Sequence, residues 1–165
     1  MLTEKESVCA YLDKQGICYE RIDHPAIFTI DGLNTLELSS ERLEQIPKNL
    51  FLKDRKKNYY LVVLKGDKRL DLKGLGKVLE VKELSFASEE VLWERLGLKK
   101  GAVTPLGLLN DKEDAVRLII DKEMMALPVW GVHPNDNTAT IFLAPKDILT
   151  VTEHEGVSLE IPSKE

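Results

Sequence analysis

The sequence predicts an α+β fold, a single domain in which helices pack on a curved, mixed β-sheet. Short apolar runs typical of strands alternate with capped, amphipathic segments typical of helices. The connections are of both the hairpin and the crossover kind, which predicts a sheet of mixed direction. The length of 165 residues suits one core and is too short for two ordinary domains, so we expect one domain over residues 1–165.

The elements of the N-terminal half are predicted from caps, alternation and turn residues. In order, they are a helix from a capping box at residues 3–6 to Gly16, a strand at 19–22 ended by His24-Pro25, a hairpin of strands 48–53 and 59–64, and a glycine-weakened helix at 71–79.

The C-terminal half begins with a helix over residues 88–96, because Ser88 can cap it, acidic residues fill its first turn and Gly97 can end it. Apolar runs and Pro145, which can open a helix, predict the remaining elements. These are strands at 115–120, 128–132 and 138–143, a helix from 145 to about 152, and a last strand at 157–161.

The composition excludes several classes of protein. With 43% hydrophobic and 31% charged residues the chain is an ordinary globular protein, and its charged start and short apolar runs predict a cytoplasmic protein without a membrane partner. Cys9 and Cys18 fit neither a disulfide framework nor a metal motif, and the three histidines lack the spacing of a zinc helix. We therefore expect no metal and no cofactor.

Charge is unevenly distributed along the chain. A net charge of −5 argues against general nucleic-acid binding, and against DNA as a partner. Positive charge nevertheless concentrates in one third of the chain, at Lys48, Lys53, Arg55, Lys56, Lys57, Lys65, Lys68, Arg69, Lys73 and Lys77. A solvated hairpin face explains such a cluster in most proteins, but a short RNA end would need only a local patch of this kind.

Two polar segments contain the candidate functional residues. Residues 101–107 read Gly-Ala-Val-Thr-Pro-Leu-Gly, a composition that favours a tight turn whose backbone N–H groups can hold an anion or an oxyanion. Residues 133–139 put His133 beside a proline and two asparagines, just before an apolar strand. The alternative is that both segments are ordinary turns and that His133 satisfies a neighbouring carbonyl.

Five motifs, in order along the chain, resemble those of the prolyl-tRNA editing proteins, within the YbaK-type aminoacyl-tRNA deacylase superfamily. They are His24-Pro-Ala-Ile-Phe-Thr29, Lys48-Asn-Leu-Phe-Leu-Lys53-Asp, Leu70-Asp-Leu-Lys73, residues 101–107, and His133-Pro through Asn137-Thr-Ala. The resemblance covers nearly the whole chain, and the first motif is more similar to the alanine-editing branch than to the cysteine-editing branch. Residues 31–44 depart from the family pattern, in the region that bears on the amino-acid pocket.

The resemblance implies an α+β hydrolase that deacylates alanine mischarged onto proline tRNA, without a metal. It implies catalytic roles for Lys53, Gly101 and His133, with Lys53 holding a phosphate or the substrate carbonyl. The residues implied to bind substrate are Phe28, Thr29, Ala102, Val103, Thr104, Pro105, Gly107 and Asn137. The residues implied to bind tRNA are Arg55, Lys56, Lys57, Lys65 and Arg69. The expected partners are the acceptor end of mischarged proline tRNA and prolyl-tRNA synthetase.

Other functions stay open at this point. The sequence has no G-x-S-x-G elbow and no phosphate-binding loop, so a covalent nucleophile is not indicated. An aminoacyl ester is already activated, and its hydrolysis needs mainly a positioned water and an oxyanion site. The alternatives are a deacylase of cysteinyl-tRNA(Pro) and a non-catalytic module that binds tRNA or a synthetase.

Overall fold

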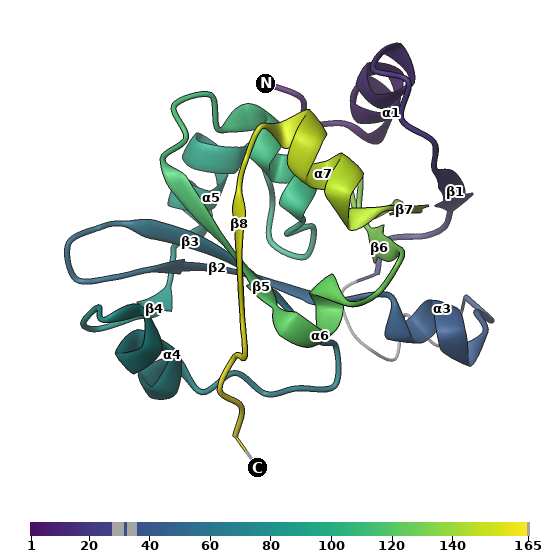
Figure 1. Ribbon diagram of the computed structural model, residues 1–165. Helices are drawn as coiled ribbons and strands as arrows, with labels where there is room; N and C mark the ends of the chain where they lie inside the picture. Colours follow the sequence, from purple (N-terminus) through teal and green to yellow (C-terminus); the bar gives the residue numbers. More distant parts are fainter. Residues whose placement is uncertain (28–31, 33–35, 165) are drawn as a thin grey trace.

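The protein is described here from a computed structural model, which covers residues 1–27, 32 and 36–164 (Figure 1). The helices are α1 (Lys5–Lys14), α3 (Ser40–Glu44), α4 (Leu72–Leu79), α5 (Glu89–Leu96), the 3-10 helix η1 (Pro105–Asn110), α6 (Lys122–Met125) and α7 (Pro145–Thr152). The strands are β1 (Glu20–Asp23), β2 (Lys48–Lys53), β3 (Tyr59–Leu64), β4 (Ser85–Phe86), β5 (Val116–Asp121), β6 (Trp130–Val132), β7 (Ala139–Leu143) and β8 (Gly156–Leu159).

The strands form two sheets rather than the one sheet that the sequence predicts. The larger sheet has the order β4-β2-β3-β5-β8, antiparallel from β4 to β3 and parallel from β3 to β8. The smaller sheet, β1-β7-β6, is antiparallel. The division arises because β3 and β8 occupy both edges of β5, so the β6–β7 hairpin pairs with β1 instead. Helices packed on mixed strands confirm the α+β class.

Two hydrophobic cores lie on the two faces of the larger sheet, and β3 serves both. Its six residues are all buried, with Leu61 and Val63 on one face and Val62 and Leu64 on the other. The larger core also takes in residues of the smaller sheet, α1, α5, η1 and α7, whereas the second core lies under α4. Within the described residues, no helix is long and apolar enough to span a membrane.

Most predicted elements are confirmed, and the start of α1 is a correction. Ser88 caps α5 by accepting a hydrogen bond from the Val91 N–H at 3.2 Å, as predicted. The capping box at residues 3–6 does not form, because α1 begins at Lys5 with no side-chain cap. Leu2 is held away from the helix by Asn110, whose Oδ1 accepts from the Leu2 N–H at 2.7 Å.

The turn between β2 and β3 depends on the buried carboxylate of Asp54. Its oxygens accept hydrogen bonds from the N–H groups of Lys56 and Asn58, both at 2.9 Å, and from the Tyr60 hydroxyl at 2.8 Å. Burial by itself would raise the pKa of Asp54, but these hydrogen bonds outweigh it and lower the pKa below its ordinary value. The carboxylate therefore stabilises the hairpin in its charged form.

We expect Asp54→Asn to lower the free energy of unfolding by about 1–3 kcal/mol at pH 7, because a neutral amide cannot accept all of these hydrogen bonds. A lowered folded-state pKa means that the contribution of Asp54 is fully present above the unfolded pKa and is lost as the pH falls through the folded pKa. The difference in the free energy of unfolding between wild type and variant should therefore become smaller below about pH 4. Urea denaturation at pH 7 and pH 3 measures it.

Asp67→Asn is the matched control, because Asp67 is exposed and pairs with Lys65 only at 3.4 Å. We expect this variant to change stability by less than about 0.5 kcal/mol at either pH. Equal effects of the two substitutions would contradict the role of Asp54.

Candidate active site

The two polar segments meet through one hydrogen bond between a side chain and the backbone. The Thr104 hydroxyl donates to the His133 carbonyl at 2.7 Å and accepts from the Leu106 N–H at 3.3 Å. Thr104 is fully buried. The structure therefore brings the two segments together, and the Thr104 hydroxyl, expected from the sequence to bind substrate, joins them instead.

The segment 101–107 runs from a half-buried turn into the buried helix η1. Gly101 has φ of +88°, a conformation that favours glycine, and it is half-buried together with Val103. The Ala102 N–H donates to the Lys99 carbonyl at 3.0 Å. Within the described part of the chain, the N–H groups of Gly101 and Val103 have no hydrogen-bond acceptor. They are the backbone donors of this turn that a ligand could use.

The second half of the segment is packed in the core. Pro105 and Gly107 are buried, and the Gly107 N–H donates to the Thr104 carbonyl at 3.0 Å. A Cβ at position 107 would lie 2.6 Å from Leu98 Cδ1, and Leu98 is itself fully buried. Gly107 is therefore a glycine because of close packing, and its predicted contact with substrate needs correction. Ala102, Thr104 and Pro105 are also buried in the protein itself.

His133 lies at the end of β6 with one ring nitrogen fixed and the other free. Its Nδ1 lies 2.7 Å from the Ala139 carbonyl oxygen, which can only accept, so Nδ1 carries the proton. Burial is the main cause that lowers the pKa of His133, and the neighbouring His24 also lowers it. The hydrogen bond to the Ala139 carbonyl and the charge of Asp136 raise this pKa but do not outweigh burial. Among the described residues, Nε2 has no partner. His133 is thus a neutral imidazole with an available lone pair.

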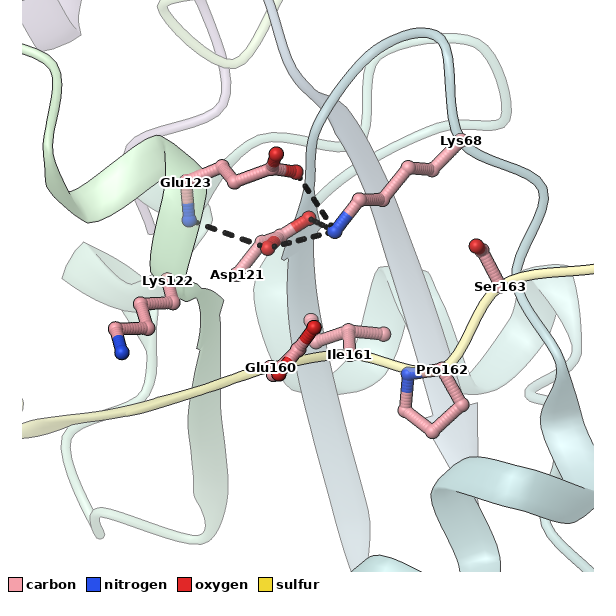
Figure 2. A pocket seen from close by; sticks show the side chains of 8 residues that line it. All are labelled: Lys68, Asp121, Lys122, Glu123, Glu160, Ile161, Pro162 and Ser163. Carbon is pink, nitrogen blue, oxygen red and sulfur yellow. Dashed lines mark hydrogen bonds and ion pairs between the residues drawn. The ribbon is translucent and has the colours of Figure 1, made fainter.

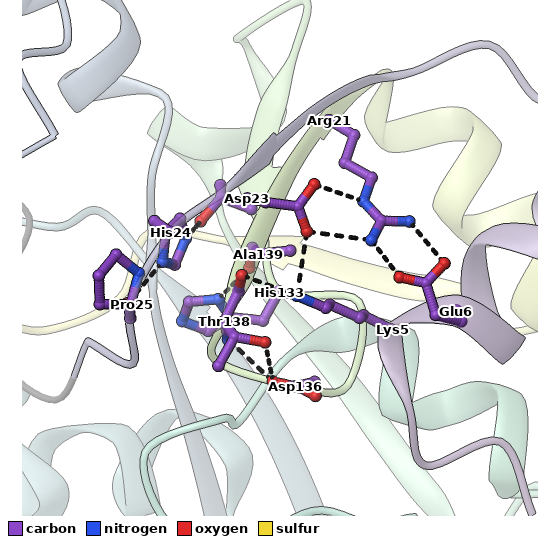
Figure 3. Close-up of polar contacts among 11 residues, drawn as sticks. Lys5, Glu6, Arg21, Asp23, His24, Pro25, His133, Asp136, Thr138 and Ala139 are labelled. Atoms are coloured by element: carbon purple, nitrogen blue, oxygen red, sulfur yellow. Dashed lines mark hydrogen bonds and ion pairs between the residues drawn. The ribbon is translucent and has the colours of Figure 1, made fainter.

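His24 is a second imidazole at this site, in a motif that the sequence singles out but without a role assigned to it. Figure 3 shows it beyond the end of β1, close to the His133 ring, and the two ring centroids are 6.1 Å apart. Its Nε2 lies 2.8 Å from Thr140 Oγ1. The signal that could have drawn attention to it is the His-Pro pair, which occurs at both positions of the sequence.

Asn137 is half-buried and joins the 133–139 loop to the chain that follows β1. Its carbonyl accepts from the Ile27 N–H at 3.3 Å, and its Nδ2 donates to the Ile27 carbonyl at 3.4 Å. Phe28 and Thr29, which the sequence predicts as lining of the amino-acid pocket, lie outside the described residues.

The structure does not bring Lys53 to His133. Lys53 ends β2 at the turn with β3, and Figure 1 shows this turn on the opposite side of the molecule from β6 and β7. The other end of β2 lies near β6, because the Gly131 N–H donates to the Gln45 carbonyl at 2.9 Å. The five residue steps of β2 span about 16 Å, so Lys53 is displaced from the site by roughly the length of the strand.

Three polar side chains that sequence reasoning did not assign lie at the near end of β2. The ammonium group of Lys48 donates to the Lys68 carbonyl. Gln45 Oε1 and Asn49 Oδ1 are buried oxygens without a hydrogen-bond partner. An unpaired buried acceptor costs about 1–3 kcal/mol, so a donor group of a ligand would be favoured here. The signal that could have drawn attention to Lys48 and Asn49 is the motif Lys48-Asn-Leu-Phe-Leu-Lys53-Asp, which they open, whereas no local pattern marks Gln45.

The predicted tRNA-binding residues form two groups instead of one patch. Arg55, Lys56 and Lys57 are exposed at the β2–β3 turn, where Arg55 pairs with Glu83 only at 3.8 Å. Lys65 and Arg69 follow β3 at its other end, and the length of β3, about 17 Å, separates the two groups.

Acidic groups neutralise much of the charge at the far end of β3. A cavity of about 600 Å³ lies between β5, α6 and the C-terminal segment. Figure 2 shows the side chains that line it. Lys68 lies at this cavity, with its Nζ 3.1 Å from the fully buried Asp121 and 2.8 Å from Glu123. Burial alone would lower the pKa of Lys68, but the two carboxylates outweigh it and raise the pKa. The exposed turn at 55–57 is therefore the stronger basic surface.

The described residues contain one group with the donor atoms of a metal site. Asp111, Asp114 and His154 lie together where η1 leads into β5 and α7 ends. His154 Nε2 is 2.8 Å from Asp111 Oδ2 and 3.3 Å from Asp114 Oδ1, distances of direct ion pairing or hydrogen bonding between the groups. The cluster joins α7 to the start of β5 and includes none of the residues of the candidate site.

Comparison with known proteins agrees with this geometry. The sequence profile of the aminoacyl-tRNA editing domain matches residues 24–151, from His24 through the 133–139 loop. The chain belongs to the aminoacyl-tRNA editing domain family. This editing domain is 40% identical over 153 residues to the prolyl-tRNA editing protein ProX of Acetoanaerobium sticklandii, with 92% of each chain covered.

Further relatives support the family and its fold. A prolyl-tRNA synthetase associated domain-containing protein 1 from Danio rerio is 35% identical over 154 residues, covering 90% of this chain and 83% of that protein. The crystal structure of a proposed trans-editing enzyme for prolyl tRNA synthetase superposes with a TM-score of 0.72 at 22% identity, covering 96% of this chain and 97% of that one. The expected family and α+β class are confirmed.

We expect the two glycines of the turn to respond differently to alanine. Gly107→Ala should lower the free energy of unfolding by about 1–3 kcal/mol, because the added methyl meets the immobile Leu98 side chain, and should leave the folded protein active. Gly101→Ala should reduce hydrolysis of alanyl-tRNA(Pro), because φ of +88° is strained for alanine and the turn would change shape. Thermal denaturation and single-turnover rates on the same samples separate the effects. A stable but inactive Gly107→Ala protein would contradict this division.

Proposed function

We propose that this editing domain hydrolyses the ester bond of alanine mischarged onto proline tRNA and releases alanine and free tRNA. The observation that carries the proposal is the Thr104–His133 hydrogen bond. It joins a turn with two backbone N–H donors to a loop with an imidazole lone pair, all three without a partner among the described residues. Ester hydrolysis without a protein nucleophile needs these two kinds of group. The name of the Acetoanaerobium sticklandii relative, a prolyl-tRNA editing protein, supports the same substrate class.

The proposed reaction uses water as the nucleophile. Water adds to the ester carbonyl while His133 Nε2 takes a proton from it, and the N–H groups of Gly101 and Val103 hold the resulting oxyanion. The tetrahedral intermediate then collapses, the ribose oxygen of the terminal adenosine leaves and takes the proton from His133, and the imidazole returns to its neutral form. Neutral His133 is required at the start, which is consistent with its lowered pKa.

Alanine is the proposed amino acid because a synthetase site built for proline cannot strongly exclude a smaller side chain. Each missing methylene group changes the binding free energy by only about 1–3 kcal/mol. A second site must therefore remove the mischarged alanine by selecting for size. The pocket residues proposed from the sequence include Phe28, Thr29 and Asn137. The buried oxygens of Gln45 and Asn49 are suited to accept hydrogen bonds from the α-ammonium group of the aminoacyl ester.

For the cation of the site we favour Lys48 over Lys53, the residue expected from the sequence. Lys48 occupies the end of β2 that adjoins β6, and its ammonium group donates to the Lys68 carbonyl. A phosphate or the substrate carbonyl can replace this carbonyl as the acceptor. Lys53, at the other end of the strand, belongs with Arg55, Lys56 and Lys57. These residues are proposed to contact the phosphates of the acceptor stem, with a smaller contribution from Lys65 and Arg69.

A deacylation panel tests the substrate. Purified protein should hydrolyse alanyl-tRNA(Pro) faster than cysteinyl-, seryl- or prolyl-tRNA(Pro), and EDTA should leave the rates unchanged because the proposed chemistry uses only backbone donors, His133 and one lysine. Faster hydrolysis of cysteinyl-tRNA(Pro) would favour the cysteine-specific alternative. Binding of tRNA(Pro) without turnover of any ester would favour a non-catalytic module.

Paired lysine variants test the position of the cation. We expect Lys48→Ala to reduce kcat/KM on alanyl-tRNA(Pro) by about 100-fold or more, in the range found when an oxyanion or substrate-holding donor is removed. Lys53→Ala should cost less than about tenfold and should act mainly by weakening tRNA binding in a salt-dependent way. Single-turnover rates at several salt concentrations measure both. The reverse order of the two variants would restore the role expected for Lys53.

A further inference from the structure

His24 is attached to the site by its backbone and by both ring nitrogens. Its N–H donates to the Thr138 carbonyl at 3.0 Å, which extends the β1–β7 ladder by one residue. Its Nδ1 lies 2.8 Å from the Pro25 carbonyl oxygen, so Nδ1 carries the proton of the neutral ring. Nε2 then accepts from the hydroxyl of Thr140, a residue only 2% exposed. The ring therefore has a single orientation.

His133 has the same tautomer, held by a different carbonyl. Both rings carry the proton on Nδ1, and both present an Nε2 lone pair. Thr140 occupies this lone pair in His24, whereas in His133 none of the described residues does. The ring centroids are 6.1 Å apart with an angle of 61° between the planes. At this distance a proton on one imidazole disfavours a proton on the other, because like charges repel.

Within the part of the chain that the structure describes, three charged side chains surround the pair. From the 133–139 loop, Asp136 faces His133 and favours its protonated form, while its carboxylate is held by the Thr138 N–H at 2.8 Å and the Thr138 hydroxyl at 2.7 Å. From α1, Lys5 reaches the same loop, with its Nζ 3.3 Å from the Thr138 carbonyl. From β1, Asp23 is paired with Lys5 and Arg21, both at 3.0 Å (Figure 3).

We infer that His24 is a positioning residue of the editing site: its fixed ring lies against the His133 imidazole, so that the His133 Nε2 lone pair stays available to the substrate or to water. Its consequence for the reaction rests on the proposed function. His24 contacts no reacting atom in this arrangement and acts through His133. It opposes Asp136, so the two neighbours of His133 adjust its protonation in opposite directions.

Two substitutions that should shift the pKa of His133 in opposite directions test this inference directly by NMR. His24→Gln keeps an amide that can bond Thr140 but removes the charge that can form, so the pKa of His133 should rise by about half to one pH unit. Asp136→Asn keeps an acceptor for Thr138 but removes the carboxylate charge, so the pKa of His133 should fall. Histidine ring signals followed from pH 4 to pH 9 report both. Shifts in the same direction would indicate a merely structural effect and would overturn the inference.

A second variant covers the case in which His24→Gln does not fold. His24→Asn also removes the imidazole ring, so the pKa of His133 should rise again. This titration needs no enzymatic activity. An unchanged pKa of His133 in either folded variant would overturn the coupling, whatever the substrate of the protein proves to be.

The pH dependence of kcat/KM connects the coupling to the reaction. If His24 keeps His133 neutral, His24→Gln should move the acidic limb of the profile on alanyl-tRNA(Pro) to higher pH, and the rate on that limb should fall by about three- to tenfold. An unmoved limb with a shifted His133 pKa would overturn the catalytic part of the inference. Absence of deacylation in the wild type, with the NMR shifts present, would instead reject the proposed function and retain the coupling.

Discussion

The complete burial of β3 on both faces is the constraint on which the rest of the structure depends. A strand that packs on both sides needs apolar layers above and below it, and Leu61 and Val62 contribute to opposite cores. The parallel strand β5 lies beside β3, and β8 covers the far edge of β5. The hairpin of β6 and β7 consequently forms a separate sheet with β1, and the connections around this second sheet contain the candidate site.

The candidate site is built mainly from backbone contacts, which explains how loops can hold its side chains in fixed positions. The bond from Thr104 to the His133 carbonyl, the bond from His133 to the Ala139 carbonyl and the pairing of Asn137 with Ile27 each fix a loop by a main-chain group. Among the described residues, the groups without a partner include the N–H donors of Gly101 and Val103 and the Nε2 lone pair of His133. A site of this kind is suited to an activated ester, because it binds charge that develops in the reaction and needs no nucleophile of its own.

Charge is arranged so that the site and the basic surface are distinct. The length of β2 separates Lys48 from Lys53 and the turn at 55–57, and Asp121 and Glu123 neutralise Lys68 at the far end of β3. An acidic protein of net charge −5 can thus present a local basic surface for an RNA end. Near His133, two neighbouring side chains have opposite effects on its pKa: His24 lowers it and Asp136 raises it.

The sequence by itself determined the elements whose signals are local. Ser88 and Gly97 delimit α5, the turn at 55–57 pairs two apolar runs as a hairpin, and the ordered motifs from His24 to Asn137 identify the family. Only the tertiary structure decided that the strands form two sheets, that Thr104 and Gly107 are buried, that Lys53 lies a strand's length from the site, and that His24 lies beside His133. The physical reason is that caps, turns and alternation depend on neighbours within a few residues, whereas burial, sheet membership and the distance between charges depend on contacts between residues far apart in the chain.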